Sequence, residues 1–258
     1  MEDIKEMYMR VPPVSRYFIT LVFALSFATT YKILSPYSII LDFEKVFGSF
    51  QIWRLVTTYA FAGPFSMNFI FTMMMLFYSF KGCEEFYKEK YPEYITMLIF
   101  NAVMTFIYSF IYGSYMILMT AFVFSVLYVW CKNEPDRQVS LWGIPVQTGN
   151  LPWALLLMSI LTGGSPFDDL IGIAAGHTYI FLKMTLPNSH GYDLIKTPKF
   201  LENFVMKLVM QARAAQGNAR VHNMAGERIN VGPQHNQGAA NGAQFRAFAG
   251  RGVRIGGM

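Results

Sequence analysis

The stretch GIAAGHTY, residues 172–179, places two glycines and a histidine inside an apolar segment. Glycines four residues apart lie on one face of a helix and let a neighbouring helix approach closely. A histidine at membrane depth is costly, so it marks either a functional site or a satisfied buried contact. The stretch predicts a tightly packed membrane helix, and it raises the question whether His177 belongs to a catalytic pair.

The composition of the whole chain is that of a membrane protein. Of its 258 residues, 53% are hydrophobic, 17% are aromatic and 14% are charged, and the mean hydropathy is +0.31. The net charge of +5 is concentrated between apolar runs rather than spread over a soluble fold, so no nucleic-acid partner is expected. Cys83 and Cys131 cannot form a disulfide framework, and we expect reduced thiols, no metal site and no cofactor.

Apolar runs predict six membrane-spanning helices. A span needs about 20 apolar residues, and fewer where the bilayer thins or the helix lies in a bundle. The uncharged stretch from Tyr94 to Cys131 is too long for one span, and a turn at Tyr112-Gly113-Ser114 divides it into two. Ser165 and the proline after it predict the start of the last span. The six predicted spans are 17–34, 65–80, two within 94–131, 151–162 and 170–186.

The lysines and arginines orient these spans. Six spans place both termini on one side, and of the 21 basic residues all but Lys32, Lys45 and Arg54 fall on that side. Both termini are therefore expected in the cytosol. The predicted fold class is an all-α polytopic membrane protein. Its parts are a cytosolic segment 1–16, a six-span domain 17–186, a cytosolic amphipathic segment 187–216 and a disordered tail 217–258.

Two regions after the last span carry different patterns. Residues 199–209 have apolar pairs every four residues, which predicts an amphipathic helix on the cytosolic membrane surface. From Gly217 onward the chain is rich in Gly, Asn, Gln, Ala and Arg, and it cannot bury enough surface to fold alone. Its last residues regain Phe248 and Ile255 among glycines and arginines. This spacing is typical of a short linear motif that orders on a partner.

Polar groups at membrane depth favour a protein that perturbs lipid or opens a polar path. Asn68 and Asn101 lie within predicted spans, and the fifth span is short. Trp53 and Arg54 occur in the first non-cytosolic loop, where an indole suits the headgroup level and a guanidinium reaches lipid phosphate or backbone carbonyls. An ordinary aromatic anchor would explain the same dipeptide.

Intramembrane serine proteolysis requires a serine activated by a histidine. Rhomboid proteases carry the serine in a Gly-x-Ser motif on the fourth span and the histidine on the sixth. Ser109, Ser114 and Ser125 all lack glycine at that spacing, so no enzymatic activity is expected and His177 is assigned to packing or hydrogen bonding. The alternative is an active rhomboid-type protease that uses Ser114, which follows Gly113 directly. A transporter or channel is a further alternative, which only Lys183 near a span end would support.

These features together resemble the derlins, the rhomboid pseudoproteases of the endoplasmic reticulum. They are Trp53-Arg54, Gly172-x-x-x-Gly176-His177, six spans with cytosolic ends and the absence of Gly-x-Ser at the serines of the third and fourth spans. The fragments PVSRY, FQIWR, LYVW, LPW and TPKFL follow in the family's order between about residues 12 and 201. The tail resembles the Phe-x-Gly-x-Gly-x-x-Leu box with which animal-type derlins dock a hexameric AAA ATPase. Its residues here are Phe248, Gly250, Gly252, Arg254 and Ile255, with isoleucine in the usual leucine position.

The resemblance implies a rhomboid-like six-transmembrane-helix bundle in the endoplasmic reticulum membrane, without catalysis. It implies retrotranslocation of misfolded proteins for ubiquitin-proteasome degradation, through a thinned bilayer and a lateral gate near spans two and five, where Asn68 lies. Trp53 and Arg54 would shape the luminal membrane surface, and Gly172, Gly176 and His177 would pack span six. The implied partners are the AAA ATPase, a ubiquitin-ligase complex, misfolded substrates and other derlins in homo- or hetero-oligomers.

Overall fold

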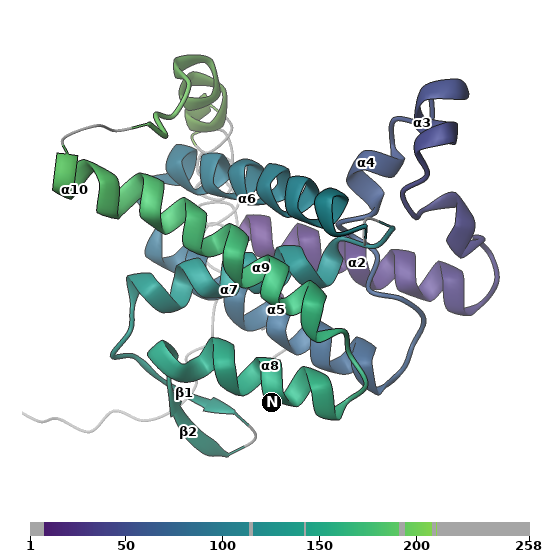
Figure 1. Cartoon of the computed structure of the whole chain (residues 1–258), viewed down its shortest axis with the longest axis horizontal. Helices are drawn as coiled ribbons and strands as arrows, with labels where there is room; N and C mark the ends of the chain where they lie inside the picture. Colours follow the sequence, from purple (N-terminus) through teal and green to yellow (C-terminus); the bar gives the residue numbers. More distant parts are fainter. Residues whose placement is uncertain (1–7, 114–115, 142, 191–193, 208–209, 211–258) are drawn as a thin grey trace, which may run out of the picture. The chain divides into compact units, whose positions relative to one another are not determined.

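The computed structural model describes residues 8–113, 116–141, 143–190, 194–207 and 210. Each of the six predicted spans overlaps a helix in this structure (Figure 1). The six helices are α2 (Pro13–Thr30), α5 (Met67–Phe86), α6 (Tyr91–Tyr112), α7 (Met119–Asn133), α8 (Leu151–Leu161) and α9 (Pro166–Ile180). A π-helical turn, Phe181–Thr185, continues α9 into α10 (Leu186–His190). The predicted tail from residue 217 lies outside the described residues.

The helices differ in length. Within the described ranges, α6 is the one helix that is long and apolar enough by itself to cross a membrane, with 22 residues and a mean hydropathy of 1.8. Helices α7 and α9 have 15 residues each, and α8 has 11. Helix positions thus agree with the sequence prediction, whereas several helices are shorter than a full span.

Local signals start and stop the helices. The Ser66 hydroxyl accepts a hydrogen bond from the amide of Phe69 and caps α5, and the Ser165 hydroxyl does the same for the amide of Asp168 in α9. Helix α6 ends at Gly113, whose φ of +88° is the left-handed conformation that glycine adopts without strain. The cap at Ser165 and the turn at Gly113 are those that the sequence predicts.

Within the described ranges the chain is mostly helical, as the all-α prediction requires, but a short hairpin follows α7. Strands β1 (Gln138–Leu141) and β2 (Ile144–Gln147) form an antiparallel hairpin in which Val139 lies opposite Val146. Gly143 has a φ of +86° in the turn between them. Charged residues and a proline at 134–137 end the apolar helix, and the alternating segment after them pairs its backbone groups with each other.

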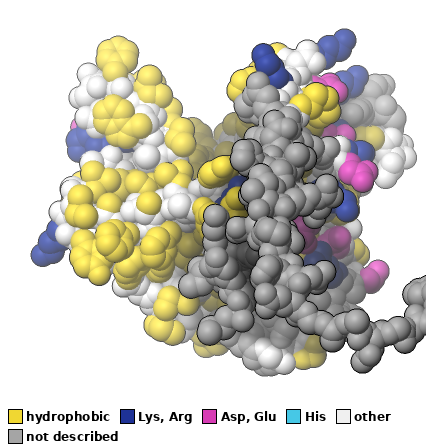
Figure 2. Space-filling model, turned by 180° about the vertical axis from the view of Figure 1, so that it is seen from behind, with side chains coloured by type: hydrophobic (Ala, Val, Ile, Leu, Met, Phe, Trp, Pro, Cys, Tyr) yellow, Lys and Arg dark blue, Asp and Glu magenta, His cyan; other side chains and the backbone are white. Residues whose placement is uncertain are grey.

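The first loop is built from short elements. They are a 3-10 turn (Pro36–Ser38), α3 (Phe43–Gly48) and α4 (Arg54–Thr57). Elsewhere in the chain, a second 3-10 turn (Thr148–Asn150) precedes α8. Asp42 caps α3 and pairs with Lys45 at 3.1 Å, and its side-chain hydrogen bond with Lys45 lowers the pKa of the Asp42 carboxyl. Hydrophobic side chains gather on the side of the molecule that carries α2, α3 and α4, and charged side chains gather on the opposite side (Figure 2).

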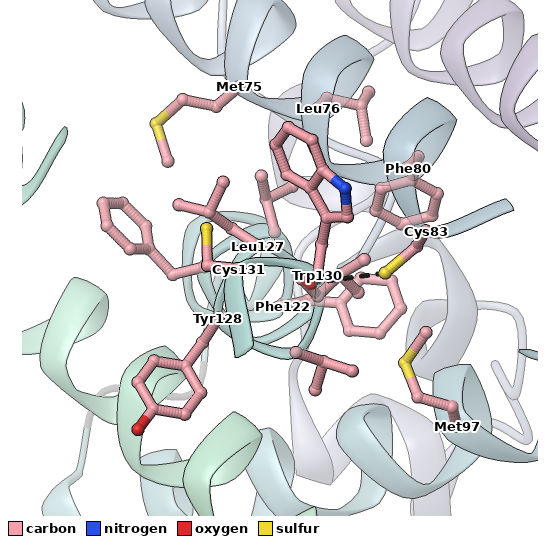
Figure 3. Close-up of a cluster of buried hydrophobic side chains, with 14 of the residues drawn as sticks. Met75, Leu76, Phe80, Cys83, Met97, Phe122, Leu127, Tyr128, Trp130 and Cys131 are labelled. Carbon is pink, nitrogen blue, oxygen red and sulfur yellow. Dashed lines mark hydrogen bonds between the residues drawn. The ribbon is translucent and has the colours of Figure 1, made fainter. Parts of the chain in front are cut away.

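Helix α7 lies at the centre of the core. Every residue from 121 to 131 is buried, and α7 packs against α5 on one side and α9 on the other. Figure 3 shows Trp130, Leu127 and Phe122 of α7 among Met75, Leu76 and Phe80 of α5. Gly82 makes room for the indole, because a Cβ at that position would overlap the Trp130 ring. A helix buried on all sides fits the continuous apolar sequence of this segment.

The amphipathic segment is helical over 199–207. Phe200 and Phe204 are 75% and 61% exposed on one face, whereas Val205 is buried. The loop before this helix is tied to the end of α9, because the Lys183 ammonium donates to the carbonyl of Ile195 at 2.9 Å. The predicted apolar face is therefore present within the described part of this segment, and residues 208 and 209 lie outside it.

Candidate functional site

The two glycines of α9 face α7 at very close range. A Cβ on Gly172 would overlap the carbonyl oxygen of Ala121 and approach the Cβ of Phe124 to 2.6 Å. A Cβ on Gly176 would lie 2.6 Å from the carbonyl oxygen of Ser125. The four-residue glycine spacing therefore forms a seam in which the backbones of two helices touch. This is the contact that the sequence stretch predicts.

His177 is bonded to a tyrosine on the same seam. Its Nδ1 lies 2.9 Å from the hydroxyl of Tyr128 on α7, and the two rings meet edge to face at 5.8 Å. The Lys132 ammonium lies 5.5 Å from the centre of the Tyr128 ring. Tyr128 is buried, whereas His177 is exposed on the outer surface of the bundle. The histidine thus links α7 to α9 rather than lining an enclosed pocket.

The described serines do not form a catalytic pair with His177. The hydroxyl of Ser125 donates to the carbonyl of Phe122 at 2.7 Å. Ser109, which lies on α6, is buried, and its hydroxyl has no hydrogen-bond partner among the described residues. Ser114, the serine of the protease alternative, lies outside the described residues. A histidine that activates a nucleophilic serine must lie within hydrogen-bond distance of the serine hydroxyl. Among the described residues, the side-chain hydroxyl bonded to His177 is that of Tyr128.

Arg54 holds the first loop together. Its guanidinium donates to the carbonyls of Tyr37 and Ile40 at 2.6 and 2.8 Å, and its Nε donates to the Gln51 side chain at 2.7 Å. The side chain is 3% exposed. The sequence left two partners open for this guanidinium, lipid phosphate and backbone carbonyls. In the structure it donates to backbone carbonyls. The planar guanidinium donates from Nε and Nη1 in fixed directions, and the single ammonium nitrogen of a lysine lacks this fork geometry.

Trp53 is exposed, unlike its buried neighbour Arg54. It is 55% exposed, and Phe50 and Phe47 are 78% and 75% exposed in the same loop. Phe50 has a φ of +53°, which is costly for a bulky side chain. Exposed aromatic side chains on a buried polar anchor form a surface suited to the membrane interface.

Asn68 lies in a polar cavity at the start of α5. The cavity has a volume of about 250 Å³ and is enclosed by α5, α7, the end of α8 and the turn into α9. Its polar lining consists of Asn68, Thr72, Thr120, Ser159, Ser165 and Asp168. The family resemblance implies a lateral gate near the second and fifth spans, and the structure brings Asn68 of α5 and Ser159 of α8 to one cavity.

The sequence analysis missed the buried carboxylate beside this cavity. Asp169 follows Asp168 in the first turn of α9 and is completely buried, and neither of its oxygens has a hydrogen bond among the described residues. In the sequence the Asp168-Asp169 pair looks like a favourable charge at a helix N-terminus. No local signal separates the two aspartates, because only the packing of α8 against α9 decides which of them is buried.

The other predicted features have different outcomes. Cys83 and Cys131 are free, as expected, and both are buried. No group of three or more His, Cys, Asp or Glu side chains that could hold a metal occurs within the described ranges. The terminal box, which comprises Phe248, Gly250, Gly252, Arg254 and Ile255, lies outside those ranges.

Comparison with known proteins gives a consistent family assignment. The profile of the Der1-like family matches residues 11–199. Derlin-1.1 of Zea mays is 32% identical over 230 residues, which cover 85% of this chain and 94% of that protein. Derlin-1 of Oryza sativa subsp. japonica is 31% identical over 95% of this chain and 99% of its own, and Derlin-1 of Arabidopsis thaliana is 33% identical over 78% and 77%.

The matched region contains the glycine seam, the Arg54 clamp and the Asn68 cavity, so the structural features described above lie within the part shared with these relatives. The family also explains the membrane composition and the resemblance seen in the sequence. The chain belongs to the Der1-like family, and with it to the endoplasmic-reticulum-associated membrane proteins of the ER-associated degradation system.

Proposed function

We propose that this chain is a non-enzymatic retrotranslocation factor that moves misfolded proteins from the endoplasmic reticulum to the cytosol. In this proposal six helices cross the membrane as a rhomboid-like bundle, with both termini in the cytosol. The observation that carries the proposal is the Asn68 cavity, which places polar groups between α5, α7 and the α8–α9 turn. An unfolded segment exposes backbone amides and carbonyls, and a polar cavity offers them partners that lipid cannot.

The short helices support a role in thinning the bilayer. Helix α8 has 11 residues, which at 1.5 Å per residue gives about 17 Å, against about 30 Å for the hydrocarbon core. Helix α7, with 15 residues, gives about 23 Å. A bilayer that meets such helices thins locally, and this lowers the barrier to polar groups. The exposed aromatic surface around Trp53 would add to this perturbation on the luminal side.

We propose that the chain is not a protease because His177 is hydrogen-bonded to Tyr128. The imidazole is engaged by Tyr128, and tyrosine at that position holds α7 and α9 together rather than attacking a peptide. The sequence lacks the Gly-x-Ser motif at each of the three serines considered. Gly172, Gly176 and His177 then serve the seam that keeps the cavity walls in place.

Partners follow from the tail and from the family. The terminal box would recruit a hexameric AAA ATPase that pulls the substrate from the membrane, and a ubiquitin-ligase complex would mark it. Other copies or other derlins would complete a conduit as homo- or hetero-oligomers. Phe248 would be the aromatic anchor of the ATPase contact and Ile255 the aliphatic one.

The Asn68 cavity can be tested by a single substitution. Asn68→Leu keeps the side-chain size but removes the polar group, and we expect it to lengthen the half-life of a misfolded luminal substrate severalfold. The measurement is a cycloheximide chase in cells that lack the endogenous protein. Met73→Leu, on the same helix but outside the cavity lining, is the matched control and should degrade the substrate normally.

Equal half-lives for Asn68→Leu, Met73→Leu and the unmodified chain, at equal expression, would contradict a role for the cavity. Cleavage of a model transmembrane substrate by the purified chain, lost in Ser114→Ala, would contradict the non-enzymatic proposal and establish the protease instead.

A further inference from the structure

A second cavity lies where α2 begins and α5 ends, away from Asn68. Its volume is about 420 Å³, and its lining combines three basic side chains, Arg10, Arg16 and Lys81, with apolar side chains that include Val11, Ile19 and Phe77. Aspartate and glutamate are missing from the described residues that line it. The buried carboxylate of Glu84 is already used nearby, since it accepts hydrogen bonds from the amides of Val14 and Ser15.

Arg16 is a buried cation with poor hydrogen-bond acceptors. It is 8% exposed, its Nη1 donates to the Met9 sulfur at 2.9 Å, and its guanidinium lies 5.5 and 5.3 Å from the ring centres of Tyr8 and Tyr17. Among the described residues, no carboxylate oxygen comes within 4.0 Å of it. A thioether is a weak acceptor, and a guanidinium has five N–H donors.

Arg54 shows what a satisfied buried arginine looks like in the same chain. It is also almost fully buried, but three oxygen acceptors surround it at 2.6 to 2.8 Å. A buried charge is costly unless it is paired and hydrogen-bonded. The described part of the chain gives Arg16 no such set of oxygens, and Arg16 lines a cavity. The difference points to an anionic group that supplies the missing acceptors.

Lys81 adds a second positive charge that is only partly neutralised. Its ammonium lies 3.8 Å from the Glu85 carboxylate and 5.5 Å from the centre of the Phe77 ring. Glu85 also pairs with Arg137 at 3.6 Å, so one carboxylate serves two cations. The cavity therefore has a positive rim, which attracts a phosphate in particular because guanidinium binds phosphate oxygens in a bidentate manner.

The lining changes from basic to apolar along both helices. Ile19 lies about one turn further into α2 than Arg16, and Phe77 lies about one turn further from the end of α5 than Lys81. Glu84 joins the start of α2 to the end of α5. The basic side chains therefore lie near these helix ends, and the apolar side chains lie about one turn further along each helix. Free phosphate gains nothing from the apolar walls, whereas a phospholipid fills both levels.

We infer that this cavity binds one anionic glycerophospholipid, with its phosphate on Arg16 and Lys81 and an acyl chain along Ile19 and Phe77. The site lies apart from the Asn68 cavity and requires no misfolded substrate. It adds a lipid-recognition function to the retrotranslocation role proposed above. The lipid would fix the start of α2 against the end of α5.

Native mass spectrometry of the full chain in mild detergent tests this inference. With phosphatidylinositol and phosphatidylcholine at equal concentration, we expect one phosphatidylinositol to be retained in preference. Arg16→Gln should weaken its binding about tenfold or more, since hydrogen bonds to a charged group are lost. Arg16→Lys should weaken it less, because the charge remains but the bidentate geometry does not. Lys88→Gln removes an exposed charge that does not line the cavity and should bind like the unmodified chain.

Three results would overturn the inference: equal affinity of Arg16→Gln and the unmodified chain, equal retention of the two lipids, or displacement of phosphatidylinositol by millimolar inorganic phosphate, which would assign the site to free phosphate. Size-exclusion chromatography and circular dichroism check the fold of each variant. If Arg16→Gln does not fold, Lys81→Gln replaces it, since that side chain is half-buried, and unchanged affinity in Lys81→Gln counts against the site.

Discussion

At the scale of single residues, buried charges hold the ends of the helices and loops. Arg54 ties the first loop through carbonyls of Tyr37 and Ile40, and Glu84 joins α2 to α5. The Glu84 carboxylate accepts from the amides of Val14 and Ser15 at 2.9 and 2.7 Å and from the Ser15 hydroxyl at 2.6 Å. It thus satisfies amides at the start of α2 that the helix itself leaves without partners.

Glu84→Ala should destabilise the fold by about 3 kcal/mol, because the amides and the hydroxyl remain buried after their acceptor is removed. The measurement is the midpoint of thermal or denaturant unfolding of the purified chain in detergent. Glu85→Ala is the matched control. Its side chain is 40% exposed and makes surface ion pairs, so we expect a loss of less than about 1 kcal/mol. A Glu84→Ala protein as stable as Glu85→Ala would show that the joint between α2 and α5 contributes little.

At the scale of elements, the seam between α7 and α9 sets the geometry of the bundle. Gly172 and Gly176 bring the backbone of α9 against Ala121 and Ser125 of α7, and the bond between His177 and Tyr128 closes the same contact. The seam lies between the Asn68 cavity and the π-helical turn that continues α9. Separation of these two helices would therefore displace cavity walls contributed by Val123 and Phe124 of α7.

Gly172→Leu should separate the helices and destabilise the protein by about 3 kcal/mol or more, because the added side chain meets backbone atoms that cannot move aside. Gly176→Ala should cost less, about 1 to 2 kcal/mol, since its nearest atom is slightly further away. Ala174→Leu is the control, because that position is exposed on α9. The measurement is unfolding in detergent together with degradation of a misfolded substrate in cells. Normal stability of Gly172→Leu would refute the close seam.

At the scale of the whole molecule, the proposal assigns substrate passage to the membrane domain and ATPase recruitment to the terminal box, which lies about 40 residues further along the sequence than the amphipathic helix. The box is separated from the amphipathic helix by a polar, glycine-rich segment of the sequence. Changes in the box should then leave the membrane domain intact. This separation makes ATPase recruitment testable without disturbing the cavities.

Phe248→Ala combined with Arg254→Ala should reduce capture of the AAA ATPase from detergent extract roughly thirtyfold or more, as expected for the loss of an anchoring aromatic and an arginine. The measurement is a quantitative pull-down with the full chain. Phe245→Ala combined with Arg246→Ala makes the same chemical changes outside the box and should retain capture. Equal capture by both double variants would remove the tail from the recruitment model, while unchanged unfolding in detergent confirms that the fold is intact.

Helix positions and many helix ends were determined by the sequence itself. The apolar runs, the cap at Ser165 and the turn at Gly113 act over a few residues, so their effect can be predicted without knowing the fold. The spacing of Gly172 and Gly176 in α9 likewise predicted a close contact between helices. The hairpin after α7 was missed because its strands are only four residues long and β2 contains a proline.

Only the tertiary structure decided which polar groups meet. His177 and Tyr128 are 49 residues apart, and Glu84 and Ser15 are 69 apart. The burial of Asp169, the convergence of Asn68 and Ser159 on one cavity and the isolation of Arg16 beside another also depend on how distant helices pack. A local signal depends on neighbours along the chain, whereas the cost of burying a polar group depends on neighbours in space, and those are set only when the helices pack together.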